Sequence, residues 1–140
     1  MISFIIPTLN EEKYIGKTLS YISLYKGTHE IIVSDTNSPD KTVEIAKKYT
    51  DSIVVHSKEG QKLTIAAGRN LGASKSSGDY LVFIDAEICI VDPNGFFDKA
   101  FACFEKDKDL VAITSQLRIF KEVETFLTLI FTVFLVCLIL

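Results

Sequence analysis

Four short apolar runs, separated by segments with helical spacing, constrain the fold of this chain more than any other feature. The runs are ISFIIP (2–7), EIIVS (30–34), SIVVH (52–56) and DYLVFI (79–84). Apolar residues recur every three or four positions, as on one face of a helix, in the segments 8–25, 38–50, 62–76 and 94–107. Alternating strands and helices predict an α/β fold with a mostly parallel sheet, and strands that are apolar on both faces are typical of a sheet flanked by helices on both sides.

Two of the helix starts are predicted from capping residues. Asn10 is the expected N-cap of the first helix, with Glu11 and Glu12 in its first turn. Ser38 is the expected N-cap of the second helix, with Pro39 at its first position.

The later segments are less regular. In the third helix, Gly68 and Gly72 either weaken the helix or mark close packing. LVAITSQL (110–117) is predicted to be a fifth strand, and the remainder from Arg118 a last helix.

The composition narrows the class of protein. A chain of 140 residues with a formal net charge of -3 fits one domain, and without a cluster of Lys and Arg we expect no nucleic-acid partner. The N-terminus does not resemble a signal peptide. Cys89, Cys103 and Cys137 lack metal-type spacing, so we expect buried, reduced thiols and a cytoplasmic location.

The loops that follow the strands carry most of the chemistry. Ligands of open α/β sheets bind beyond the carboxyl ends of the strands, where this chain has PTLNEE (7–12), DTNSPD (35–40) and DAE (85–87). The glycine-rich signatures of dinucleotide-binding folds and P-loops are absent from the sequence. Carboxylates repel phosphates unless a cation lies between them, and Mg²⁺ and Mn²⁺ prefer oxygen ligands. The loops therefore predict a bound nucleotide, with a divalent metal bridging Asp85 or Glu87 to its diphosphate.

Each of these residues also has a structural interpretation. Asp85 and Glu87 can belong to an ordinary turn, and Asp35 can be a turn-forming side chain. Glu11 can complement a helix dipole, and Arg69 can be a solvated charge.

Three stretches together resemble a known family. IIPTLNEEKYIGKTL, EIIVSDTNSPDKTVEIA and GRNLGASKSSGDYLVFIDAE resemble the N-terminal half of family 2 glycosyltransferases of the GT-A fold, from Ile2 to about Glu87. The resemblance implies a Rossmann-like, mostly parallel sheet flanked by helices. It also implies metal-assisted transfer of a sugar from a UDP- or GDP-type nucleotide sugar to an acceptor, with Mg²⁺ or Mn²⁺ as the cofactor.

The resemblance assigns one group of residues to the nucleoside. Pro7, Thr8 and Glu11 would line the pocket for the base and ribose. Asp35 would accept a hydrogen bond from the base, which is typically uracil in the family.

It assigns a second group to the diphosphate. Arg69 and Asn70 would lie near it, and Asp85, Ala86 and Glu87 match the D-x-D motif. Asp85 and Glu87 would bind the ribose and the metal, which stabilises the leaving group as its negative charge develops.

The sequence departs from the family in two places. The family often has two acids and a glycine after the second strand, where this chain has Ser34-Asp35-Thr36-Asn37. No general base is identified, since none of the acids after Glu87 lies in a recognisable acceptor motif. We therefore expect a nucleotide-sugar-binding domain at 1–117 that is truncated relative to the family, and an apolar helix at 118–140.

Two alternatives stay open. The first is an incomplete, non-catalytic fragment that binds a nucleotide or pairs with another subunit. The second is a sugar-phosphate nucleotidyltransferase, which would need a glycine-rich loop after the first strand in place of PTLNEE. The acceptor is not identified, and lipid-linked and polysaccharide acceptors both fit.

The C-terminal segment has a membrane-like composition. Phe126–Leu140 carries no charge, and as a helix it would be about 22 Å long, shorter than a membrane core of about 30 Å. Lys121 and Thr132 mark the ends of a polar stripe that favours a helix lying at a membrane interface or packed on protein, and the membrane face we expect is the cytoplasmic one. The alternatives are a helix that self-associates or fills a groove, a membrane span, and an aggregation-prone strand.

Overall fold

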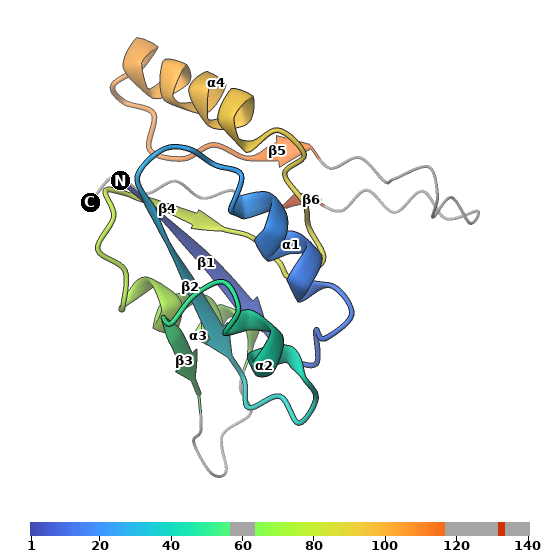
Figure 1. Ribbon diagram of the computed structural model, residues 1–140. Helices are drawn as coiled ribbons and strands as arrows, with labels where there is room; N and C mark the ends of the chain where they lie inside the picture. The colour runs from blue at the N-terminus through green and yellow to red at the C-terminus, as the bar shows by residue number, and fades with distance from the viewer. Residues whose placement is uncertain (57–63, 117–131, 134–140) are drawn as a thin grey trace, which may run out of the picture.

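Four parallel strands form the main sheet of the chain, whose computed structural model describes residues 1–56, 64–116 and 132–133 (Figure 1). The strands are β1 (Ile2–Thr8), β2 (His29–Asp35), β3 (Ile53–Val55) and β4 (Tyr80–Phe83). Their order across the sheet is β3-β2-β1-β4, and Ile2 is in register with His29 on one side and Tyr80 on the other. The predicted α/β fold with a parallel sheet is confirmed.

Helices cover both faces of this sheet (Figure 1). They are α1 (Ile15–Ile22), α2 (Thr42–Ala46), α3 (Ile65–Ala73) and α4 (Pro93–Lys106). Side-chain caps explain two of the starts: Thr64 Oγ1 accepts the N–H of Ala67 (3.2 Å), and Asp92 Oδ1 accepts that of Gly95 (3.0 Å). Pro93 stands in the first turn of α4, where its missing N–H costs nothing.

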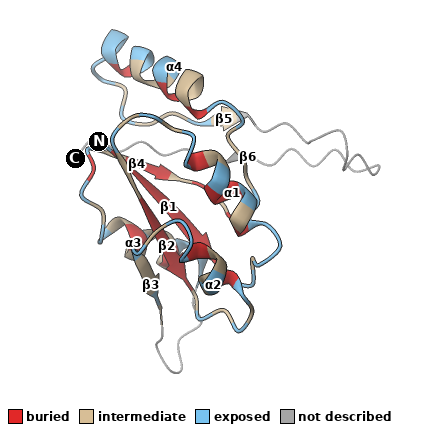
Figure 2. Ribbon diagram, in the orientation of Figure 1, coloured by how far each residue is buried: buried red, intermediate tan, exposed pale blue. Residues whose placement is uncertain are grey.

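The main core lies between the sheet and the layer of α1, α2 and α4. Alternate residues of β1, including Phe4 and Ile6, face this layer and are fully buried. Phe97 of α4 packs edge-on against Phe4, with ring centroids 5.4 Å apart. Figure 2 shows the resulting band of buried residues along the central strands.

α3 covers the opposite face through two glycines. A β-carbon added at Gly72 would lie 2.5 Å from Ile5 Cγ2, and one added at Gly68 would lie 3.4 Å from Pro7 Cβ. The glycines therefore mark close packing of α3 on β1, which was one of the two interpretations of their presence in the helical segment.

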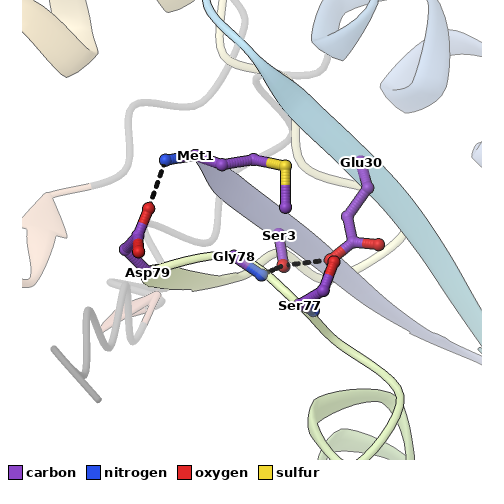
Figure 3. A network of polar contacts seen from close by, with 6 residues as sticks. All are labelled: Met1, Ser3, Glu30, Ser77, Gly78 and Asp79. Carbon is purple, nitrogen blue, oxygen red and sulfur yellow. Dashed lines mark hydrogen bonds and ion pairs between the residues drawn. The ribbon is translucent and has the colours of Figure 1, made fainter.

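A polar network ties the strands together at their amino ends (Figure 3). The Ser3 hydroxyl donates to Glu30 Oε1 (2.5 Å) and accepts the N–H of Gly78 (2.9 Å). Ser77 donates to the same Glu30 oxygen through its N–H (2.6 Å) and its hydroxyl (3.0 Å). Burial raises the pKa of Glu30, but the hydrogen bonds from Ser3, Ser77 and Gly78 outweigh it, so the pKa lies below its ordinary value.

The predicted N-cap of the first helix is wrong. α1 begins at Ile15, and Asn10 precedes it in a left-handed conformation with φ of 60°. The N–H of Asn10 donates to Ser38 Oγ at 2.9 Å. A contact with a neighbouring loop thus replaces the cap, and Glu11 and Glu12 lie before the helix.

The predicted start of the second helix is wrong for a related reason. α2 begins at Thr42, so Ser38 and Pro39 belong to the loop that precedes it. The Ser38 hydroxyl donates to Asp35 Oδ1 (2.6 Å) and is not free to cap a helix.

The predicted fifth strand does not join the main sheet. Residues 110–114 form no strand, and β5 (Ser115–Gln116) pairs antiparallel with β6 (Thr132–Val133) in a separate two-stranded sheet. Strand propensity does not specify a pairing partner, which explains the error. Thr132–Val133 is therefore a strand where a helix was predicted, and the rest of 117–140 lies outside the described residues.

Two further predictions concern a membrane span and the burial of the cysteines. None of the helices in the described ranges is long and apolar enough to cross a membrane. Cys89 is partly buried and Cys103 is exposed, so the prediction of a buried thiol is wrong for Cys103. Cys137 lies outside the described residues.

Candidate functional site

The last residues of β1 and β2 meet at the carboxyl edge of the sheet. Thr8 and Asp35 are in register, and Thr8 Oγ1 donates to Asp35 Oδ1 at 2.8 Å. Both side chains are buried, with exposures of 3% and 0%. The parallel register brings these two predicted site residues together at the carboxyl ends of their strands, where ligands of open α/β sheets bind.

Asp35 makes two more hydrogen bonds within its own loop. Ser38 donates to it through its N–H (2.7 Å, to Oδ2) and through its hydroxyl (2.6 Å, to Oδ1). With the bond from Thr8, about three of the roughly four acceptor positions of this carboxylate are filled. These bonds give Asp35 a loop-forming role, and a contact with a nucleobase stays a prediction.

The loops after β1 and β2 are joined by a row of backbone amides. Three successive N–H groups of the first loop donate to side chains of the second loop or of the start of α2: Asn10 to Ser38 (2.9 Å), Glu11 to Thr42 (2.8 Å) and Glu12 to Asp40 (3.1 Å). The N–H of Lys41 donates back to Glu12 Oε2 at 3.1 Å. The backbone around Glu11 is therefore fixed by the second loop.

Arg69 of α3 forms an ion pair with Asp85, which follows β4. The distance from the Arg69 terminal nitrogen to Asp85 Oδ1 is 2.6 Å, and about a quarter of each side chain is exposed (26% and 25%). Within the described part of the chain, Arg69 Nε is buried and has no hydrogen-bond partner. The close packing of α3 on β1 thus places the guanidinium at the D-x-E motif, and Arg69 is not a solvated charge.

The D-x-E motif itself forms a tight turn. The N–H of Ile88 donates to the Asp85 carbonyl at 3.0 Å. Ala86 is buried, and its carbonyl accepts the Thr18 hydroxyl of α1 at 2.5 Å. Glu87 is exposed, so the turn leaves its carboxylate accessible while Ala86 anchors the backbone.

Acidic groups gather around Glu11. Partial burial raises the pKa of Glu11 above its ordinary value, and the negative charges of Glu87, Asp40 and Asp85 raise it further. Arg69 balances part of this negative charge at Asp85, and the remaining carboxylates suit a cation. In the parts of the chain that the structure describes, no group of three or more His, Cys, Asp or Glu side chains forms a metal site. Two carboxylates suffice for Mg²⁺ or Mn²⁺ when substrate phosphates complete the coordination, so Asp85 and Glu87 fit such a metal.

Two predicted residues lie apart from this cluster. Asn70 is exposed and lies two positions after Gly68, on the side of α3 that faces away from the sheet. Pro7 is buried beneath α3, next to Gly68. Their contacts with a ligand stay predictions.

Several residues of the site were not found by sequence reasoning. Ser38 and Thr42 hold the two loops together, and Thr18 anchors the D-x-E turn. The N–H of His56 donates to the Asp35 carbonyl at 2.7 Å. The only signal for Ser38 was a hydroxyl residue in a ligand-edge loop, which is also the signal for a helix cap, and Thr42 lay inside the predicted second helix.

Comparisons with known proteins agree with this geometry. The sequence profile described as "Glycosyl transferase family 2" matches residues 3–132. Glycosyltransferase AglE of Haloferax volcanii is 35% identical over 92 residues, which are 61% of this chain and 30% of AglE. Poly(ribitol-phosphate) beta-N-acetylglucosaminyltransferase TarS of Staphylococcus aureus is 32% identical over 92 residues, which are 61% of this chain and 16% of TarS.

Solved structures share the arrangement of strands and helices. The structure of S. aureus TarS 1–349 in complex with UDP matches with a TM-score of 0.63 and 27% identity, covering 75% of this chain and 32% of that one. Glucosyl-3-phosphoglycerate synthase of Mycobacterium tuberculosis, in complex with Mn²⁺, UDP and glucosyl-3-phosphoglycerate, matches with a TM-score of 0.54 and 29% identity, covering 75% and 39%. The predicted GT-A-like fold is confirmed, and the chain spans well under half the length of these relatives.

Proposed function

Because the chain belongs to glycosyl transferase family 2, we propose that the carboxyl edge of its sheet binds the nucleoside diphosphate of a nucleotide sugar together with Mg²⁺ or Mn²⁺. Sugar transfer from this donor to an acceptor is the reaction that we assign to the whole protein. The single observation that carries the proposal is the Arg69–Asp85 ion pair beside the acidic cluster around Glu11. A UDP-type donor is favoured by the UDP found in two solved relatives.

Different residues at this edge would bind different parts of the donor. Asp85 and Glu87 would hold the metal, which when bound neutralises charge that develops on the diphosphate. Arg69 is already at Asp85, and its guanidinium has the donor geometry that suits phosphate oxygens. The loops after β1 and β2, with Thr8, Glu11 and Asp35, would lie along the nucleoside. We assign no general base among the described residues.

Calorimetry on the chain with UDP and with GDP, each with and without Mn²⁺, tests donor binding. We expect Mn²⁺-dependent affinity for one of them, and a loss of about tenfold or more in Asp85→Asn, since one charge-assisted contact is worth roughly 1.5–3 kcal/mol. Asp98→Asn on α4 is the matched control, because Asp98 is exposed and the charge change is identical. Unchanged, metal-independent binding in Asp85→Asn would contradict the assigned role.

Catalysis and binding are tested separately, because the chain matches a minor part of each relative. Sugar transfer or donor hydrolysis that disappears in Asp85→Asn would exclude a non-catalytic nucleotide-binding fragment. Donor binding without turnover would favour the fragment. The cytoplasmic location, the boundary near residue 117 and the membrane contact stay predictions.

A further inference from the structure

The Ser38 hydroxyl bridges the loops after β1 and β2. It lies 2.6 Å from Asp35 Oδ1 and 2.9 Å from the nitrogen of Asn10. An ionised carboxylate only accepts hydrogen bonds, so the single hydroxyl proton must be donated to Asp35. Ser38 Oγ therefore accepts the N–H of Asn10 through a lone pair. Ser38 acts only as a donor toward Asp35 and only as an acceptor toward Asn10.

Thr42 forms a second bridge of the same kind. Its hydroxyl donates to Asp40 Oδ1 (2.5 Å) and accepts the N–H of Glu11 (2.8 Å). Thr42 is fully buried, so water cannot replace either bond without a local opening. The two bridges hold two consecutive amides, those of Asn10 and Glu11.

The backbone at Asn10 needs such support. Its φ of 60° is a left-handed conformation, which asparagine adopts more readily than most non-glycine residues but still at a cost that neighbouring contacts help to offset. Glu11 follows directly, so the position of its carboxylate depends on that conformation.

These bridges are separate from the contacts of Asp85. Thr8 and Asp35 lie on the side of the sheet covered by α1 and α2, since their alternate neighbours belong to that core. Asp85 pairs with Arg69, which comes from α3 on the other side. A change at the bridges should therefore act more on the part of a ligand that lies along the loops after β1 and β2 than on the part at Asp85, although the charges of Glu11 and Asp85 act on each other.

We propose that Ser38 and Thr42 are positioning residues that fix Glu11 relative to Asp35 and thereby set the affinity of the site for the nucleoside part of its ligand. The ligand part of this inference rests on the proposed function. The structural part, that the hydroxyls hold the loop after β1, stands without it.

The first measurement is amide hydrogen exchange, resolved by residue, in the full chain without ligand. In Ser38→Ala we expect exchange at Asn10 to accelerate about tenfold, the equivalent of one lost hydrogen bond. Ser38→Thr, which keeps the hydroxyl, and Ser20→Ala, which removes an exposed hydroxyl bonded within α1, should exchange as wild type. Unchanged exchange at Asn10 in Ser38→Ala would overturn the proposal.

Thr42→Val provides an independent variant if Ser38→Ala does not fold. Valine has nearly the same shape as threonine and removes only the hydroxyl. Exchange should accelerate at Glu11 and less at Asn10, whereas equal acceleration throughout the chain would indicate general destabilisation and overturn the assigned role.

The second measurement is the affinity of the chain for Mn²⁺ with UDP and for Mn²⁺ with pyrophosphate, which lacks the nucleoside. In Ser38→Ala we expect UDP to bind about tenfold more weakly and pyrophosphate to bind as in wild type. Equal weakening of both ligands would overturn the assignment to the nucleoside. If wild type binds neither ligand, the proposed function and the ligand part of this inference fail together, and the exchange experiment still decides the structural part.

Discussion

Replacing Gly72 by alanine would place a β-carbon 2.5 Å from Ile5 Cγ2, well inside the distance at which two carbons can approach. Ile5 is fully buried in β1, and its Cγ2 belongs to a β-branched side chain with few alternative rotamers. α3 must therefore move away from β1 to accommodate the new atom. Gly68→Ala is a matched control on the same helix, because its β-carbon would meet Pro7 Cβ at 3.4 Å, an ordinary contact distance.

Both variants gain helix propensity, but only Gly72→Ala overpacks the contact between α3 and β1. Alanine is more favourable than glycine in a helix by about 0.8–1 kcal/mol, and overpacking a core costs roughly 1–3 kcal/mol. We expect Gly68→Ala to stabilise the chain by up to about 1 kcal/mol, and Gly72→Ala to destabilise it by up to about 2 kcal/mol. The difference between them should be about 1–3 kcal/mol, the overpacking cost alone.

Urea denaturation of both variants measures this difference through the midpoint at constant slope. Because α3 also carries Arg69 to Asp85, Gly72→Ala should weaken binding of Mn²⁺ with UDP, whereas Gly68→Ala should not. If Gly72→Ala proves as stable as Gly68→Ala, the close approach of α3 to β1 does not restrict the size of the side chain at position 72.

Two other predictions test the loops and the amino edge. Asn37 has φ of 56°, where the family often has glycine; in thermal melts Asn37→Gly should equal wild type to within about 1 kcal/mol, and Asn37→Val should lose about 1–2 kcal/mol or more. An equal loss in both variants would show that the backbone conformation is not decisive. Because the pKa of Glu30 is lowered on folding, its contribution to stability is present above its ordinary pKa of 4.5 and is lost as the pH falls below that value. The stability advantage of wild type over Glu30→Gln should therefore shrink between pH 6 and pH 3, and a constant advantage would argue against the network at Ser3.

The parts of the fold that could be predicted are those in which a local sequence pattern is compatible with only one structure. Ile2–Thr8 is apolar on both faces and ends in polar residues, and it became the central parallel strand. Asn10 and Ser38 have two uses, because their side chains and amides can serve a helix start or a neighbouring loop equally well. Asn10 and Ser38 bond to the neighbouring loop because β1 and β2 lie side by side. A local sequence pattern does not show which strands are neighbours.

The same reasoning explains the site. Asp35 and Asp85 were found because parallel strands bring their carboxyl ends to one edge. The partner of Asp85 could be placed near the diphosphate only through the resemblance to the family. The ion pair itself depends on how closely Gly72 lets α3 approach the sheet, and that distance is a tertiary property.

The central position of β1 in the sheet also affects how the chain folds during its synthesis. β1 can pair with β2 once Asp35 has left the ribosome, but its other edge is covered only after Tyr80–Phe83 has emerged. At about 5–20 residues per second, this delay is roughly 2–10 s. Throughout that interval the nascent chain presents an unpaired strand edge, which makes it a target for chaperones and for wrong pairing with other chains.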